Sequence, residues 1–244
     1  MDESRLSQIT TQWTLIFQGC RGPDATKAAQ AEVLQRYCGA IYRYAYRALG
    51  DGDLTEEACQ EFAYRFVRGD FRHADPAKGR FRDYVKKAVI HLINEFRRRQ
   101  IQKQALPLDS QAAEAASEPS EMIAEEAQFT ALWRKELLNR TWRELELREP
   151  AQGPPSYTVL RLKADEPNVT APVLAERLER LGRGSYSAAA VRQLLHRARE
   201  SFASLLLDEV ARSILSTDQD LLASELADPE LLTYCREALA KRRA

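Results

Sequence analysis

Apolar residues recur at every third or fourth position along almost the whole chain, which is the spacing of amphipathic helices. No run of alternating apolar and polar residues marks a strand. The spacing predicts helices over 27–48, 54–68 and 81–99, and three such helices suffice to close one compact domain. A loop with glycine and proline, 69–80, separates the last two, and a further helix around Trp13 is expected before them.

A second group of helices is expected in the C-terminal half of the chain. Helices are predicted over 129–147, 156–164, 171–181 and 187–214, with a smaller amphipathic segment in the tail 217–244. The third and fourth of these resemble a helix-turn-helix with a long turn, a pattern that many helical hairpins share. Ser187 is expected to cap the last long helix by accepting a hydrogen bond from a free backbone N–H of its first turn.

The segment between the two groups differs in composition. It has two prolines, many Ala and Ser, and six acidic residues against no Lys or Arg: Asp109, Glu114, Glu118, Glu121, Glu125 and Glu126. Such a sequence favours an extended acidic linker. The expected fold class is therefore all-α, with two small helical domains joined by this linker. The expected boundaries are an N-terminal arm 1–26, a first domain 27–103, the linker 104–127, a helix-turn-helix domain 128–214 and an extension 215–244.

Charge is distributed unevenly although the totals cancel, with 36 basic and 36 acidic residues. Between Phe71 and Lys103 there are ten bases and three acids, a local charge of +7. Lys and Arg side chains release counterions from the phosphates of a nucleic acid, and exposed aromatic rings stack on unpaired nucleobases. The spacing of Phe81, Tyr84 and Phe96 is also that of core residues, so a solvated helix is the alternative. Three consecutive arginines, Arg97–Arg99, favour a polyanionic partner because they repel one another without one.

The last long helix carries a second set of polar residues that fit DNA. Val191, Leu194, Leu195 and Ala198 are expected to face inward. The outward residues would then include Ser187, Arg192, Gln193, His196, Arg197 and Arg199. Arg and Gln can read guanine and adenine edges in the major groove, while Arg197 and Arg199 would lie near phosphates. His196 is expected to lie at the surface rather than to act as a ligand or base.

Several functional classes are disfavoured by the residues. The chain has no apolar run long enough for a membrane span and no secretory signal, so a cytoplasmic protein is expected. Its four cysteines are widely spaced, which favours buried reduced thiols over a zinc site. No phosphate-cradling glycine loop and no pairing of His with a nucleophile is present, so an enzyme, a metal site and a cofactor are not expected.

Four motifs follow one another along the chain: Glu56-Glu57-Ala58-Cys59-Gln60-Glu61-Phe62, His73–Arg82, Asn94-Glu95-Phe96-Arg97-Arg98-Arg99 and Ser187–Arg199. In this order they resemble the sigma-70 family of RNA polymerase sigma factors, extracytoplasmic-function (ECF) subfamily. The resemblance covers roughly Trp13 to Ile214 and rests on the ordered set rather than on any one motif.

The resemblance implies a role for each part. The first motif would bind the beta-prime clamp helices of core RNA polymerase through Glu56, Glu57, Gln60, Glu61 and Phe62. The minus-ten element of promoter DNA would be read and melted by His73, Lys78, Arg80, Arg82, Lys86, Asn94, Arg97, Arg98 and Arg99, with one base flipped into the loop 69–80. The last helix would read the minus-thirty-five element, its domain resting on the flap of the beta subunit. The acidic linker would thread the polymerase cleft.

Regulation is left open between an anti-sigma factor, a Ser/Thr kinase and the tail. Leu54 and Thr55 stand where the family often has an acid followed by Ala, so the acidic patch is thinner. Phosphorylation of Thr55 would restore negative charge there, although Thr is also an ordinary residue near a helix N-terminus. The tail beyond Ser216 is additional to the resemblance and could fold back on a binding face.

Two further readings compete with a sigma factor. A helix-turn-helix regulator with an N-terminal sensing or dimerisation domain would bind DNA without polymerase. A helical adaptor would use its basic faces to bind acidic proteins and would not bind DNA in a salt-sensitive way. The arginine cluster and the acidic linker favour the sigma factor.

Overall fold

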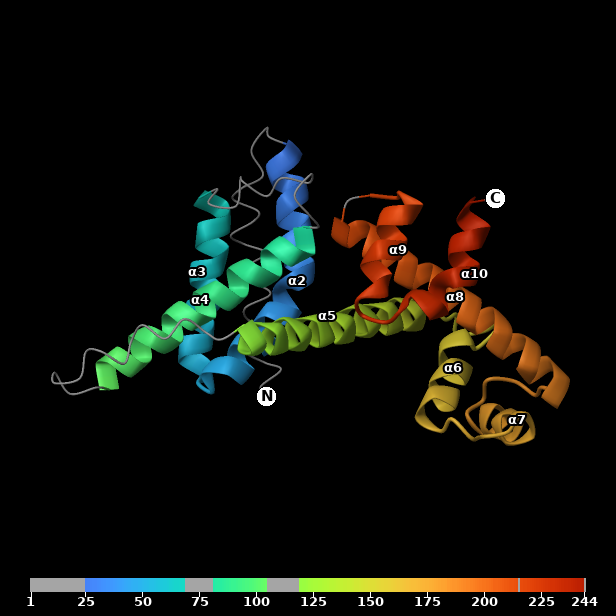
Figure 1. Ribbon diagram of the computed structural model, residues 1–244. Coiled ribbons are helices and arrows are strands. Elements are labelled where there is room, and N and C mark those ends of the chain that lie inside the picture. Colours follow the sequence, from blue (N-terminus) through green and yellow to red (C-terminus); the bar gives the residue numbers. More distant parts are fainter. Residues whose placement is uncertain (1–24, 69–80, 105–118, 215, 244) are drawn as a thin grey trace. The chain divides into compact units, whose positions relative to one another are not determined.

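The computed structural model describes residues 25–68, 81–104, 119–214 and 216–243 (Figure 1). All regular structure in these residues is helical, which confirms the expected all-α class. Contacts divide the chain into two units. Unit 1 runs to Glu136 and includes Ser213–Leu215, and unit 2 comprises Leu137–Arg212 and Ser216–Ala244. No helix in the described residues is both long enough and apolar enough to cross a membrane.

Unit 1 contains α2 (Ala25–Leu49), α3 (Gly52–Arg68), α4 (Phe81–Gln104) and the first half of α5 (Pro119–Arg148). Helices α2, α3 and α4 pack against one another (Figure 1). The turn from α2 to α3 is short because Gly50 adopts φ +70°, a conformation that glycine takes without strain. Asp51 then caps α3, its carboxylate accepting from the backbone N–H groups of Asp53 at 2.8 Å and Leu54 at 2.9 Å.

The core of unit 1 is rich in aromatic side chains from helices distant in sequence. Tyr37 of α2 stacks on Trp133 of α5 with ring centroids 6.1 Å apart. Tyr44 of α2 meets Phe129 of α5 edge-on at 5.9 Å. Both α5 rings are fully buried, so the first half of α5 is an integral part of this core. The unit boundary consequently falls within α5 after Glu136, not after residue 127 as the composition suggested.

The expected acidic linker lies partly outside the described residues, which omit 105–118. Its last part, 119–126, is helical and begins α5, so an extended conformation was the wrong expectation there. Glu125 and Glu126 both form ion pairs with α4. The composition assigned these two acidic residues to a linker, whereas their carboxylates contact a basic helix of the same unit.

Unit 2 contains the second half of α5, then α6 (Ser156–Asp165), α7 (Ala171–Arg180), α8 (Ala188–Ile214), α9 (Gln219–Ala227) and α10 (Leu232–Arg243). An apolar core joins α5, α6, α7 and α8. The chain turns away after α7 at Gly182, which has φ +67° and whose N–H donates to the Glu179 carbonyl, while the Arg183 N–H donates to the Leu178 carbonyl. The predicted cap of α8 is confirmed, since Ser187 Oγ accepts from the Ala190 N–H at 3.1 Å.

The tail forms two helices, α9 and α10, that pack on each other. Asp218 caps α9 by accepting from the N–H groups of Asp220 and Leu221. α10 is tied to α8 by ion pairs from Lys241 to Glu200 and from Arg242 to Asp208, the latter at 2.6 Å. The tail contacts named here thus fall on the part of α8 that follows residue 199. The hydrogen bond from Lys241 lowers the pKa of the Glu200 carboxyl.

Candidate protein-docking and nucleic-acid interfaces

A shallow groove of about 230 Å³ lies between α3 and α4 in unit 1. Its lining residues are Glu57, Gln60, Glu61, Tyr64, Phe96 and Arg99. The apolar floor is Phe96, which is almost buried, and Tyr64 rises beside it with 58% of its surface exposed. A groove with an apolar floor, an exposed aromatic ring and acidic residues on its α3 side is suited to the side of a partner helix that carries basic residues.

A network of ion pairs, in which basic and acidic residues alternate, runs between the two helices at this groove. Arg65 of α3 donates to Glu61 at 2.7 Å and to Glu95 of α4 at 2.9 Å. Glu95 lies 3.7 Å from Arg99 in turn. The hydrogen bond from Arg65 is the main cause that holds the pKa of Glu95 below its usual value. Because both helices contribute, this network connects α3 to α4 at the groove.

Three of the five residues expected to bind polymerase line this groove: Glu57, Gln60 and Glu61. Glu56 is half-buried on the same helix. Phe62 is 1% exposed and belongs to the core of unit 1, so it cannot contact a partner in this structure. Its apolar character marks it as a core residue.

Tyr64 and Arg99 complete the groove and were not assigned to it from the sequence. Tyr64 follows Gln60 by four residues, which places both on one side of a helix. An aromatic residue on an otherwise polar helical face was the signal that could have identified it. Arg99 had been assigned to DNA, yet its guanidinium lies 5.5 Å from the ring of Phe96 in the groove floor.

Thr55 is not available for phosphorylation in this structure. Its side chain is fully buried, and its hydroxyl donates to the Asp51 carbonyl at 2.5 Å. A kinase needs the hydroxyl oxygen exposed, and a phosphate in this position would lack room. Thr55 therefore serves as a structural residue of the first turn of α3, the ordinary alternative for this position.

One face of α4 is covered by α5. Arg82 is 1% exposed, and its guanidinium lies 4.5 Å above the ring of Trp133. Lys86 is buried and pairs with Glu126 at 2.8 Å. The two residues had been expected to contact DNA, but in this structure their charged groups contact α5. Spacing along the chain does not indicate this contact, because Trp133 lies 51 positions beyond Arg82.

The covered face continues to the end of the basic run. Arg97 donates to Glu125 at 2.7 Å and to the carbonyl of Ala48 at 3.2 Å. Asn94 donates to the same carboxylate at 3.4 Å and accepts from Arg97 at 3.1 Å. Arg97 is only partly exposed as a result. Residues 94 and 97 are thus engaged within unit 1, although both were expected to contact DNA.

The opposite face of α4 is exposed and basic. Arg98 lies on it, as expected for a DNA-contacting residue, together with Lys87 and His91. These three residues recur at intervals of four and seven, which places them on one stripe. Lys87 and His91 were not assigned from the sequence, because periodicity alone did not show which side of α4 is covered. His73, Lys78 and Arg80 lie outside the described residues.

The start of α8 has the exposure that the sequence predicts. Val191, Leu194, Leu195 and Ala198 are buried. The exposed residues are Ser187, Arg192, Gln193, His196, Arg197 and Arg199. His196 lies 3.5 Å from Glu200 at the surface. The exposed set offers guanidinium and amide groups of the kind that read base edges, on a helix whose first turn holds only small residues.

A buried carboxylate links three segments of unit 2 and was missed from the sequence. Glu149 has a side chain only 2% exposed and pairs with Arg183, in the turn before α8, at 2.8 Å. It also accepts from the backbone N–H of Thr158 at 2.8 Å and from the Thr158 hydroxyl at 2.5 Å. One carboxylate thereby joins the end of α5, the first turns of α6 and the turn between α7 and α8.

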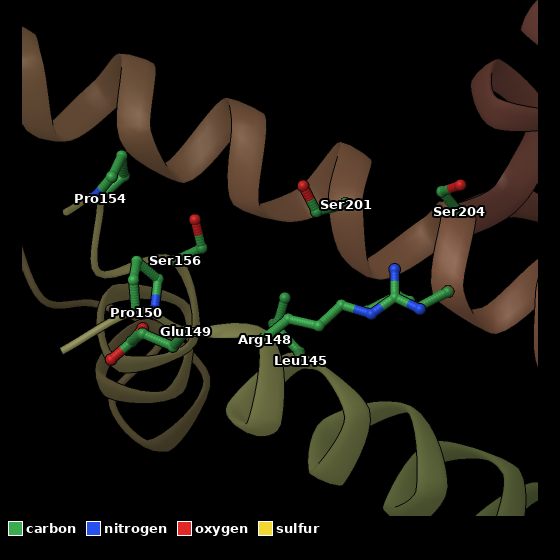
Figure 2. Close-up of a pocket in the computed structure, with 9 residues that line it drawn as sticks. Leu145, Arg148, Glu149, Pro150, Pro154, Ser156, Ser201 and Ser204 are labelled. Atoms are coloured by element: carbon green, nitrogen blue, oxygen red, sulfur yellow. The ribbon is translucent and has the colours of Figure 1, made fainter. Parts of the chain in front are cut away.

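A cavity of about 280 Å³ lies next to this carboxylate, between the end of α5, the following loop and α8 (Figure 2). Its lining residues are Leu145, Arg148, Glu149, Pro150, Pro154, Ser156, Ser201, Ser204 and Leu205. The lining brings hydroxyl groups together without a histidine or thiol beside them. Elsewhere, the described residues contain no cluster of potential ligands for a metal ion.

Comparisons of the chain with protein-family models, with curated proteins and with solved structures find no match. Function is therefore inferred from the residues and from their geometry.

Proposed function

We propose that this protein is an alternative sigma factor that binds core RNA polymerase and directs promoter recognition, local DNA melting and the start of transcription. The observation that carries the proposal is the combination of three surfaces in one chain. Unit 1 has the acidic α3–α4 groove, and its helix α4 has an exposed basic stripe of Lys87, His91 and Arg98. Unit 2 presents a capped helix-turn-helix with exposed arginines.

Each surface has a distinct partner in this proposal. The groove of Glu57, Gln60 and Glu61 binds a helix of the polymerase clamp through its acidic walls and Tyr64. The basic stripe of α4 contacts the phosphates of the melted strand, where each contact adds to affinity by releasing counterions. Arg192, Gln193, Arg197 and Arg199 read duplex DNA upstream, and their placement on one helix suits a major groove.

Run-off transcription with purified core polymerase and DNA from upstream of the protein's own operon tests the proposal. We expect a specific transcript. Reversing the groove charge with Glu57→Lys and Gln60→Lys should abolish both the transcript and co-purification with core polymerase. Glu146→Lys with Gln152→Lys, which adds the same three positive charges at exposed positions of unit 2, is the matched control and should retain both. The substitutions Lys87→Ala and Arg98→Ala should lower promoter opening while polymerase binding persists.

Absence of any transcript and of co-purification with polymerase would refute the sigma-factor proposal. If the protein then bound operon DNA as a dimer, a helix-turn-helix regulator would be the better description. If it bound acidic proteins but no DNA, it would be a helical adaptor.

A further inference from the structure

The first half of α5 covers a set of polar residues on α4 that otherwise suit nucleic acid. Lys86 pairs with Glu126 at 2.8 Å, and Arg97 pairs with Glu125 at 2.7 Å. Asn94 donates to the same Glu125 carboxylate at 3.4 Å. The two carboxylates therefore occupy the positions that phosphate oxygens would take next to these cations, since both kinds of group accept charge-assisted hydrogen bonds.

Apolar packing holds these carboxylates in place. Phe129 follows Glu125 by four residues and Trp133 follows by eight, so all three lie toward one side of α5. Phe129 is fully buried against Tyr44, and Trp133 is buried between Tyr37 and the guanidinium of Arg82. Displacement of α5 would expose both rings, so the cover is more than a surface ion pair between two mobile side chains.

The two faces of α4 thus differ in access. Lys87, His91 and Arg98 are exposed, whereas Arg82, Lys86 and part of Arg97 are not. A nucleic acid that needed the whole basic run would have to replace α5. DNA that uses these covered residues must first break their contacts with α5, and the cost of breaking them is subtracted from its binding free energy. The free protein should therefore bind DNA more weakly than its basic residues alone would allow.

We infer that Glu125 and Glu126 of α5 are internal competitors of DNA: in the free protein they neutralise Lys86 and Arg97 of α4, and DNA gains these two cations only when it displaces the two carboxylates from them. The inference rests on the proposed function, because it concerns regulation of the same DNA-contacting helix.

Two double variants of the full chain test the inference. Glu125→Gln with Glu126→Gln removes the competing charges and keeps side-chain volume. Glu144→Gln with Glu146→Gln removes two charges from the same helix, with contacts only in unit 2: Glu144 pairs with Arg148, and Glu146 lies next to Tyr157. Both variants have the same net charge, so a difference between them reports position rather than total charge. Circular dichroism establishes that each variant is folded.

The probe is a fluorescein-labelled mixed-sequence DNA strand of 25 nucleotides, titrated by anisotropy over a range of salt concentrations. For the Glu125/Glu126 variant we expect affinity about tenfold above that of the control at 0.1 M salt, because two more phosphates are neutralised. The slope of log K against log salt should steepen by about 1.4, since each contact to a single strand contributes about 0.7. Adding Lys86→Gln and Arg97→Gln to this variant should remove the gain.

Equal affinity and equal slope for the two double variants would overturn the inference, as would a gain that survives loss of Lys86 and Arg97. Lack of binding by both would overturn it too. Run-off transcription with the same proteins keeps the two proposals distinguishable. A transcript without a difference in strand binding refutes only the inference. A position-dependent gain in strand binding without any transcript refutes only the sigma-factor proposal.

Discussion

Replacement of Glu149 by Gln should destabilise unit 2 far more than the same replacement at a neighbouring surface carboxylate. The carboxylate uses one oxygen for Arg183 and the Thr158 hydroxyl, and the other for the Thr158 N–H. A Gln side chain has the same shape but only one acceptor oxygen. Either orientation of its amide turns an NH₂ group toward a donor, so at least one buried hydrogen bond is lost and the charge of Arg183 loses its partner.

The expected cost follows from these contacts. A hydrogen bond to a charged group contributes about 1.5–3 kcal/mol, and breaking a buried ion pair costs about 3–5 kcal/mol. Arg183 is one-third exposed, so water replaces part of what it loses. We therefore expect Glu149→Gln to lower the free energy of unfolding of unit 2 by about 3 kcal/mol. For a unit of roughly a hundred residues this corresponds to a Tm lowered by about 12–24 °C.

Thermal unfolding followed by circular dichroism measures the loss, and hydrogen exchange locates it. The Thr158 amide donates directly to Glu149, so exchange should accelerate first in the initial turn of α6. The control is Glu144→Gln, which removes an exposed i,i+4 pair with Arg148 and should cost under about 0.5 kcal/mol. If the free energy of unfolding of Glu149→Gln lies within about 1 kcal/mol of the parent value and the protection of α6 is unchanged, the role assigned to Glu149 is refuted.

Three other predictions follow from single contacts. The hydrogen bond from Arg65 lowers the pKa of Glu95, so this pair stabilises unit 1 at pH values above the unfolded pKa of about 4.3, and the stabilisation is lost as pH falls through the lower folded pKa. Glu95→Gln should therefore flatten the acid limb of a plot of unfolding free energy against pH. An unchanged acid limb would contradict this. Burial raises the pKa of the Cys59 thiol, so iodoacetamide should alkylate it in the native protein at least about tenfold more slowly than in denaturant; equal rates would show that it is accessible. Arg242→Ala removes the 2.6 Å pair with Asp208 and should cost about 0.5–1 kcal/mol, with faster hydrogen exchange confined to α10; loss of protection throughout α8 would mean that the tail supports the whole unit.

The sequence determined the features that depend on neighbours along one helix. The start of α8 is the clearest case, because the four residues predicted to face inward are buried and Ser187 caps the first turn. A side chain at i meets those at i+3 and i+4, so periodicity suffices to separate a buried stripe from an exposed one. The same local rule explains why Glu57, Gln60 and Glu61 share one groove.

Only the tertiary structure decided which element covers which face. The basic composition of α4 did not distinguish Lys87, which is exposed, from the adjacent Lys86, which Glu126 covers from a helix that begins after the undescribed residues 105–118. Arg82 looked like a DNA contact until Trp133 was found against it. Side-chain type and spacing state what a residue can bind, but long-range packing chooses its partner, and that choice depends on the position of every other helix in the core.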